Sequence, residues 1–180
     1  IVVSTGAKQS IANAVQVLIN PGDDVLLVAP YWVSYSAMVI LAEGNPIEIR
    51  SDIETDFKIT PAQLEAAITP KTKLVMLNSP NNPSGSVYTK EEYEALAKVL
   101  EKYTSIYVLS DEIYEHINYD NTTPFSFAAI PGMYDRTITV NGLAKAFAMT
   151  GWRIGYLGGP TWLAKACTKI QGQVTSGTNC

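Results

Sequence analysis

Residues 140–156 read VNGLAKAFAMTGWRIGY, and the rest of the chain can be interpreted around this stretch. The apolar residues 137–140 that lead into it predict a buried strand, and residues 154–157 predict another. Between the two lies a loop with one lysine, Lys145, and Arg153 stands just before the second strand. The stretch therefore predicts two buried strands joined by a loop that carries two cationic side chains.

The two cations of this loop suit two different chemical groups. The amine of Lys145 can form a Schiff base with a carbonyl carbon, and the planar guanidinium of Arg153 can donate two parallel hydrogen bonds to a phosphate. A ligand that has both an aldehyde and a phosphate is pyridoxal phosphate. An ordinary solvated loop lysine would look the same in the sequence, so a cofactor site requires further parts elsewhere in the chain.

Strand-like and helix-like segments alternate along the whole chain. Apolar runs predict strands at residues 1–3, 25–28, 47–49, 73–77, 105–110, 137–140 and 154–157. Apolar spacing, caps and helix breakers predict helices at residues 11–19, 33–42, 60–68, 89–102 and 160–174. This alternation is typical of an α/β domain with a largely parallel sheet and helices on both of its faces.

Candidate ligand-binding groups stand at the ends of these strands. The small-residue turn 4–7 leads into a helix N-terminus, whose free N–H groups favour anions. Trp32 lies just past a strand's carboxyl end, where α/β sheets bind ligands, and can stack on a flat ring. The amides of residues 78–82 can donate to a ligand oxygen, and Asp111 can pair with a cationic ring nitrogen. Each feature also has a purely structural alternative. These are a capped turn for residues 4–7, a core aromatic for Trp32, a rigid turn for residues 78–82, and a salt-bridged or helix-capping acid for Asp111.

The composition limits the classes of function. The chain has 180 residues, enough for one domain, and a net charge of −4, without the basic footprint of nucleic-acid binding. No apolar run reaches membrane-spanning length, and neither GxxxxGKS/T nor GxGxxG is present. Cys167 and Cys180 are too few for a disulfide framework or a zinc site, and we expect free thiols in a reducing cytoplasm. His116 has no second histidine or cysteine nearby and receives no catalytic or metal-binding role.

Three segments closely resemble, in order and spacing, the motifs of one enzyme family: residues 78–85, 110–114 and 141–156. The family is that of the class I/II pyridoxal-phosphate aminotransferases of fold type I, and the likeness, over essentially the whole chain, is strongest to the bacterial aspartate aminotransferases. It implies a three-layer α/β/α fold with a mostly parallel, mixed sheet of about seven strands. Residues 1–180 would be the large, cofactor-binding domain of a longer protein, without its N-terminal segment and its C-terminal small domain.

The resemblance implies a role for each matching residue. Lys145 matches the lysine that forms the Schiff base and moves a proton between the substrate's α-carbon and the cofactor. Asp111 matches the acid that keeps the pyridine nitrogen protonated, so that the ring can act as an electron sink. Tyr114 and Asn82 match the donors to the cofactor's 3-oxygen. Trp32 matches the aromatic residue that stacks on the ring, and with Asn82 it is expected to border the substrate.

Further matches concern the phosphate of the cofactor. Ala7 and Lys8 match the phosphate cup, mainly through their backbone amides, and Arg153 matches the phosphate-binding arginine. The chain departs from many relatives at Gly142, where they have a serine that binds phosphate. This departure puts one of the family's phosphate contacts in question.

The activity that the resemblance implies is the transfer of an amino group from an L-amino acid, foremost aspartate, to a 2-oxo acid, 2-oxoglutarate. Aromatic or alanine transamination and C–S lysis would use the same Schiff-base residues and stay open as alternatives. So does an aminotransferase-like domain of a transcription regulator, which a DNA-binding domain upstream of Ile1 would reveal. We expect a homodimer with no nucleic-acid or membrane partner for the intact protein. The segment alone is expected to be inactive, because the family's arginine for the substrate α-carboxylate belongs to the small domain.

Overall fold

The inner strands alternate their apolar side chains between two faces, which is the pattern of a sheet covered on both sides. The computed structural model describes residues 1–119 and 124–178. In it Leu74 and Met76 join one hydrophobic core, whereas Val75 and Leu77 join a second. A continuous apolar run therefore supplies both cores from a single strand.

In the described part of the chain, seven strands form one mixed sheet. They are β1 (Val2–Thr5), β2 (Asp24–Ala29), β3 (Asn45–Arg50), β4 (Thr72–Asn78), β5 (Tyr107–Asp111), β6 (Thr137–Gly142) and β7 (Ile154–Gly158). Their order across the sheet is β1-β7-β6-β5-β4-β2-β3. Of these seven strands β7 alone runs opposite to the others, so that its pairings with β1 and β6 are antiparallel. The expected mostly parallel, mixed sheet is confirmed.

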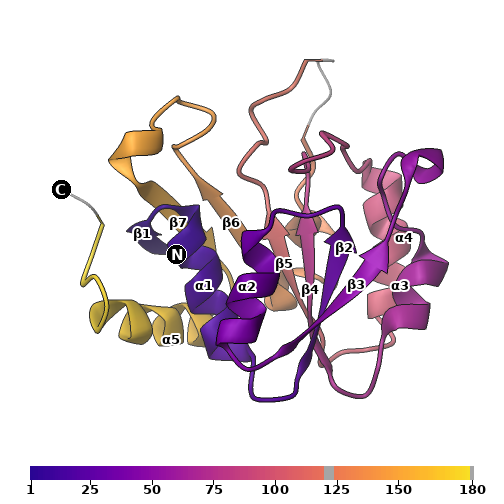
Figure 1. Ribbon diagram of the computed structural model, residues 1–180, viewed down its shortest axis with the longest axis horizontal. Coiled ribbons are helices and arrows are strands. Elements are labelled where there is room, and N and C mark those ends of the chain that lie inside the picture. The colour runs from indigo at the N-terminus through magenta and orange to yellow at the C-terminus, as the bar shows by residue number, and fades with distance from the viewer. Residues whose placement is uncertain (120–123, 179–180) are drawn as a thin grey trace.

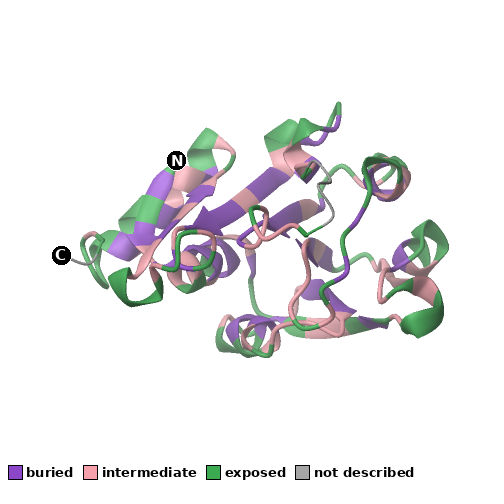
Figure 2. Cartoon of the chain, turned by 90° about the horizontal axis from the view of Figure 1, so that it is seen from above, coloured by how far each residue is buried: buried purple, intermediate pink, exposed green. Residues whose placement is uncertain are grey.

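Helices cover both faces of this sheet (Figure 1). They are α1 (Ala7–Leu18), α2 (Ser34–Leu41), α3 (Pro61–Ala67), α4 (Lys90–Leu100) and α5 (Thr161–Gly172). The first, second and fifth pack on one face and the other two on the opposite face, so the fold has three layers. Figure 2 shows the buried strands between helices whose outer sides are exposed. None of the helices in the described residues is long and apolar enough to cross a membrane.

Two helices begin at capping boxes, one at Thr60, which the sequence predicts as an N-cap, and one at Thr89, where the sequence has capping-box spacing. The hydroxyl of Thr60 accepts from the backbone N–H of Gln63, and that of Thr89 accepts from the backbone N–H of Glu92. In both cases the third residue's side chain reaches back to the N–H of the cap. Such boxes satisfy N–H groups that the first helical turn leaves without partners.

Residues 122–134 are rich in Pro, Phe and Thr, which predicts a loop, but the structure differs from this prediction. This segment contains the 3₁₀ helix Phe127–Ala129, and a second one, Tyr134–Arg136, leads into β6; residues 122 and 123 lie outside the described part. Phe127 is fully buried, with its ring edge-on to Tyr93 of α4. Packing against a distant helix orders this segment, and no local sequence pattern reports such packing.

The chain leaves two adjacent strands toward opposite faces of the sheet. β2 leads into α2 on one face, whereas its neighbour β4 leads into α4 on the other. Because the two connections diverge, a crevice opens beyond the carboxyl ends of the strands, where open α/β sheets bind ligands.

Candidate active site

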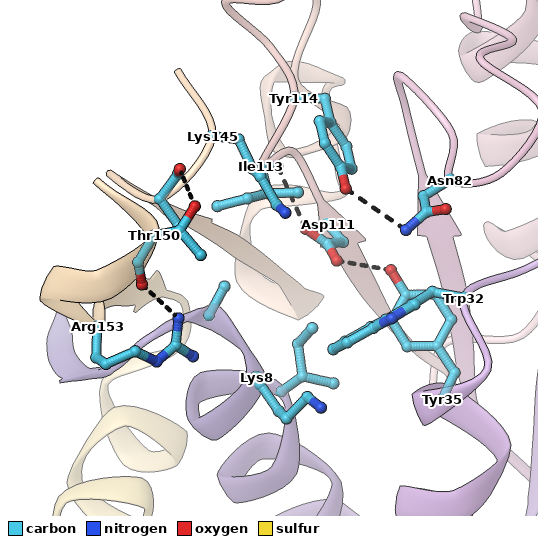
Figure 3. A pocket seen from close by; sticks show the side chains of 13 residues that line it. Lys8, Trp32, Tyr35, Asn82, Asp111, Ile113, Tyr114, Lys145, Thr150 and Arg153 are labelled. Atoms are coloured by element: carbon cyan, nitrogen blue, oxygen red, sulfur yellow. Dashed lines mark hydrogen bonds between the residues drawn. The ribbon is translucent and has the colours of Figure 1, made fainter. Parts of the chain in front are cut away.

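A cavity of about 160 Å³ opens at this carboxyl edge (Figure 3). It offers roughly ten times the space that one water molecule needs, so it is of ligand size. All the site residues predicted from the sequence line it: Ala7, Lys8, Trp32, Asn82, Asp111, Tyr114, Lys145 and Arg153. The structure adds further lining residues, namely Ile11, Tyr35, Ile113, Ala144 and Thr150.

The N-terminus of α1 forms one end of the cavity. Its N-cap is Gly6, so no side chain caps the helix, and its first turn contains no acid. The guanidinium of Arg153 lies directly against the α-carbon of Gly6, where any side chain would overlap it. Backbone N–H groups and a guanidinium at one helix N-terminus favour a phosphate.

Glycine is also required at position 155, early in β7. A Cβ there would overlap the backbone nitrogen of Ala7. The strand can therefore run close to the start of α1 only because residue 155 has no side chain. This close approach carries Arg153, at the start of the same segment, to the helix N-terminus.

Hydrogen bonds hold the loop that carries Lys145. The hydroxyl of Thr150 donates to the carbonyl of Ala144 (3.0 Å), directly before the lysine. The carbonyl of Thr150 accepts from Nη1 of Arg153 (3.1 Å). Lys145 Nζ lies 5.9 Å from the centre of the Tyr114 ring, and Figure 3 shows it pointing into the cavity. Thr150 thus links the backbone beside the amine to the guanidinium.

Asp111, the last residue of β5, places a buried carboxylate at the cavity. Its Oδ2 accepts from the phenol of Tyr35 (2.6 Å), and its Oδ1 accepts from the N–H of Ile113 (3.2 Å). Burial raises the pKa of Asp111 to about 6, although these two hydrogen bonds act to lower it. A carboxylate in this position is stabilised by a cation, such as a protonated ring nitrogen.

Asn82 and Tyr114 place two hydrogen-bonding groups on a further side of the cavity, with Asn82 Nδ2 3.4 Å from Tyr114 Oη. Asn78 supports this arrangement from outside the cavity lining. Its side chain donates to the carbonyl of Asp111 (2.8 Å) and accepts from the N–H of Asn82 (2.8 Å). Burial and the neighbouring Asp111 raise the pKa of Tyr114, so its phenol keeps a proton to donate.

Trp32 forms an aromatic wall. Its ring meets the ring of Tyr35 edge-on, with centroids 5.6 Å apart. Lys8 Nζ lies 4.9 Å from the centre of the indole in a cation–π contact. The side chain of Lys8 therefore adds a positive charge beside the wall, beyond the backbone contact that the sequence predicts.

Position 142, where the chain departs from the family pattern, is closed to side chains. A Cβ on Gly142 would lie 2.8 Å from the carbonyl oxygen of Ile154 and 3.0 Å from the α-carbon of Gly155. The two glycines are paired across β6 and β7, which brings their backbones this close. A serine at position 142 would thus require β6 and β7 to shift.

Tyr35 and Thr150 are the polar lining residues that the sequence did not single out. Tyr35 follows Trp32 by three positions, which is about one helical turn, and its N–H donates to the carbonyl of Trp32 (3.0 Å). Thr150 lies in the loop between the two predicted cations. Their closeness in sequence to predicted site residues was the available hint that Tyr35 and Thr150 line the cavity. The apolar lining residues cannot be distinguished from core residues in the sequence.

Two residues that received no chemical role lie away from the cavity lining. His116 Nε2 is 3.3 Å from Oε1 of Glu115, and its ring packs against Phe147. Cys167 is a buried free thiol whose pKa burial raises to about 11, and Cys180 lies outside the described residues. Within residues 1–119 and 124–178, no group of His, Cys, Asp and Glu could hold a metal ion.

These residues fit the parts of pyridoxal phosphate. The start of α1 with Arg153 suits the phosphate, and the amine of Lys145 suits the aldehyde. The buried carboxylate of Asp111 suits a protonated ring nitrogen, Tyr114 suits a ring oxygen, and Trp32 suits the flat face of the ring. The donor set matches each group of the cofactor with complementary chemistry.

Comparisons with known proteins identify the chain's relatives. The family model "Aminotransferase class I and II" matches residues 1–180. Identity is 52% over 179 residues to a bifunctional aspartate aminotransferase and glutamate/aspartate-prephenate aminotransferase of Petunia hybrida, covering 99% of this chain and 37% of that protein. It is 51% over 179 residues to an aspartate/prephenate aminotransferase of Cereibacter sphaeroides, covering 98% and 44%. The crystal structure of an aspartate aminotransferase from Rhizobium meliloti superposes with a TM-score of 0.95 at 49% identity, covering 97% and 44%. The chain therefore spans less than half the length of these relatives.

Proposed function

The chain belongs to the aminotransferase class I and II family, and from this premise we propose that the protein containing it transfers an amino group from L-aspartate to 2-oxoglutarate, with pyridoxal phosphate as cofactor. The observation that carries the proposal is that the amine of Lys145, the carboxylate of Asp111 and the guanidinium of Arg153 line one cavity. Aspartate is favoured because relatives at 49–52% identity carry it in their names. Residues 1–180 are proposed as the cofactor-binding domain of that protein.

Lys145 has the role of proton carrier in this proposal. When bound, pyridoxal phosphate supplies an electron sink for the negative charge that develops at the substrate's α-carbon. Lys145 Nζ would hold the cofactor at its aldehyde group. When free, the same amine would take up the proton of the substrate's α-carbon and give it back. The hydrogen bond from Thr150 to Ala144 keeps this amine within reach.

The other polar residues orient the cofactor and hold its charges. Asp111, whose pKa burial raises to about 6 in the empty cavity, would hold a proton on the ring nitrogen. Tyr114 and Asn82 would donate to the ring oxygen, and Arg153 with the start of α1 would bind the phosphate. Groups that are already in place cost no reorganisation when charge develops, which is how such sites accelerate reactions.

A homodimer in the cytoplasm is the proposed state of the intact protein, with an amino acid and a 2-oxo acid as its substrates. The family resemblance supports the homodimer and the substrate classes. A buried free thiol at Cys167 supports a reducing compartment.

The test is a trapping experiment on the intact protein. We expect a visible absorbance band with added pyridoxal phosphate, and borohydride should convert it into a stable covalent adduct. Lys145→Ala should lack the band and the adduct, and turnover of aspartate and 2-oxoglutarate should fall about 10⁴-fold, because the proton carrier is gone. Lys165→Ala, which removes an exposed lysine of α5, should behave like the unchanged protein. A trapped adduct in Lys145→Ala would contradict the assignment.

Initial rates decide among the substrates. Aspartate should exceed alanine and aromatic amino acids as donor by about tenfold or more in kcat/KM. Prephenate, which stands in the names of two relatives, is the acceptor to compare with 2-oxoglutarate. A preference for an aromatic donor or for alanine, or C–S lyase activity, would contradict aspartate as the substrate. It would not contradict the assignment of the cofactor. No band in the unchanged protein would overturn the proposed enzyme.

A further inference from the structure

Tyr35 contacts the buried carboxylate of Asp111 that lines the cavity, although nothing in the sequence assigned it a role. We propose that Tyr35 is a positioning residue for the reaction: its phenol holds Asp111 ionised and turned toward the ligand's cationic nitrogen. This inference rests on the proposed function, because the cationic nitrogen belongs to the proposed cofactor.

The geometry leaves the carboxylate little freedom. Tyr35 Oη donates to Oδ2 of Asp111 over 2.6 Å, and Oδ1 is held by the N–H of Ile113 over 3.2 Å. Tyr35 and Asp111 are both buried, at 2% and 4% exposure. A buried hydrogen bond to a charged acceptor is short and strong, and it fixes the plane of the carboxylate.

The ring of Tyr35 is itself held on two sides. The indole of Trp32 meets it edge-on at 5.6 Å, and the ring of Tyr31 stacks on it at 6.4 Å with 24° between the planes. Its backbone N–H donates to the carbonyl of Trp32 (3.0 Å). The donor of the hydrogen bond is therefore packed in place by its neighbours, which a positioning role requires.

Hydrogen bonds rather than ion pairs stabilise the charge of Asp111 in the described part of the chain. In the described residues, Asp111 forms no ion pair within 4.0 Å. The other ionisable groups that line the cavity with it are Tyr114, the amines of Lys145 and Lys8, and the guanidinium of Arg153. Burial acts against the charged form of Asp111, whereas Tyr35 and the N–H of Ile113 act for it. Of these two stabilising bonds, only that of Tyr35 comes from a side chain.

The chain offers a matched control four positions earlier. Tyr31 Oη also donates to a carboxylate, Oε1 of Glu48, over the same 2.6 Å, but this pair is exposed. Tyr31 does not line the cavity. Tyr35→Phe and Tyr31→Phe therefore remove the same atom and the same type of hydrogen bond, in one case at the cavity and in the other at the surface.

The first measurement needs no cofactor. In the intact, cofactor-free protein with ¹³C-labelled aspartate carboxyl groups, Asp111→Asn identifies the signal of Asp111. We expect Tyr35→Phe to raise the pKa of Asp111 by about 1–2 pH units, because a hydrogen bond to the charged form is lost. Tyr31→Phe should leave that pKa unchanged. An unchanged pKa of Asp111 in Tyr35→Phe would overturn the proposal.

A second variant covers the case in which Tyr35→Phe does not fold. Placing 3-fluorotyrosine at position 35 makes the phenol a stronger donor with almost no change of shape. The pKa of Asp111 should then fall, and an unchanged or higher value would overturn the proposal as well.

The cofactor-loaded protein separates this proposal from the proposed function. Tyr35→Phe should lower kcat with aspartate and 2-oxoglutarate about tenfold for each unit of pKa shift, with KM for aspartate nearly unchanged and the loss greatest at low pH. Tyr31→Phe should keep the original profile. If the unchanged protein gives no absorbance band with pyridoxal phosphate, the proposed function fails, and the carboxyl titration still decides whether Tyr35 controls Asp111. If the band is present and the pH profile of Tyr35→Phe matches that of the unchanged protein, only the positioning role fails.

Discussion

Two buried aspartates stand at opposite edges of the sheet with nearly the same hydrogen bonds. Asp111 ends β5 and accepts a phenol proton over 2.6 Å and a backbone N–H over 3.2 Å. Asp24 begins β2 and accepts the hydroxyl of Thr69 over 2.6 Å and the side-chain amide of Asn45 over 3.1 Å. Their exposures are 4% and 7%. Neither burial nor the number of hydrogen bonds distinguishes them.

The difference lies in what else surrounds each carboxylate. The partners of Asp24 come from the connection before β4 and from the first residue of β3, so its bonds tie the beginnings of neighbouring strands together. Asp111 instead borders a cavity that Lys145 and Arg153 also line. One buried acid thus ties neighbouring strands together, whereas the other borders a cavity at the edge where α/β sheets bind ligands.

The largest difference between Asp111 and Asp24 is expected when each carboxylate is replaced by a neutral amide. Asp111→Asn should lower kcat for aspartate and 2-oxoglutarate about 10²–10³-fold in the intact protein, because the charge facing the ring nitrogen is removed. The fold should persist, since the amide oxygen can still accept from Tyr35. Asp24→Asn should stay within about twofold of the original rate, because Asp24 does not line the cavity. Steady-state kinetics check both variants, and equal losses in the two would refute the division of roles.

The pH dependence of stability sharpens the comparison further. The pKa of Asp111 is about 6 in the folded chain and about 3.9 when unfolded. Between these values the folded state binds more protons than the unfolded state. The contribution of Asp111 to stability is therefore fully present below about pH 4 and is lost as the pH rises to about 6, a change of about 3 kcal/mol.

Urea unfolding of the cofactor-free intact protein between pH 4 and pH 7.5 measures this loss. Asp111→Asn should lack it and become relatively more stable as the pH rises, whereas Asp24→Asn should retain it. Parallel stability curves for Asp111→Asn and the unchanged protein would show that Asp111 titrates alike in both states.

The smallest expected effect compares two glycines of β7, one near each edge of the sheet. Gly155→Ala places a methyl group against the backbone of Ala7, whereas a Cβ at Gly158 meets no atom within 4 Å. Gly155→Ala should cost about 1–3 kcal/mol of stability and weaken binding of pyridoxal phosphate, because β7 moves away from the start of α1. Gly158→Ala should stay within about 0.5 kcal/mol. Urea unfolding and fluorescence titration with the cofactor measure both quantities, and equal behaviour would contradict the close contact.

Much of the fold follows from local patterns in the sequence. The apolar run of β4 and the capping boxes at Thr60 and Thr89 are readable because a strand's burial and a helix's first turn depend on neighbouring residues. The extension of β6 to Gly142 was not readable. Residues 141 and 142 join the strand by pairing with β7, so their state depends on a partner segment rather than on their own side chains.

The predicted lining residues of the cavity were found as motifs at strand ends. Asp111, Lys145 and Arg153 belong to segments whose order and spacing resemble a known family, so their identity could be inferred without coordinates. Tyr35 could not be inferred in this way. A tyrosine one turn after Trp32 has many possible partners, and only the fold selects the carboxylate at the end of β5.

The sequence by itself determined the elements, the fold class and most of the chemical groups at the cavity, because these follow from periodicity, caps and motifs within short segments. Only the tertiary structure decided the contacts between segments. Tyr35 meets Asp111 across 76 positions of chain, and the guanidinium of Arg153 covers Gly6 because β7 pairs with β1. The physical reason is that such contacts depend on the order of the strands and on how closely two backbones approach. Both are set by the packing of the whole chain rather than by any stretch of it.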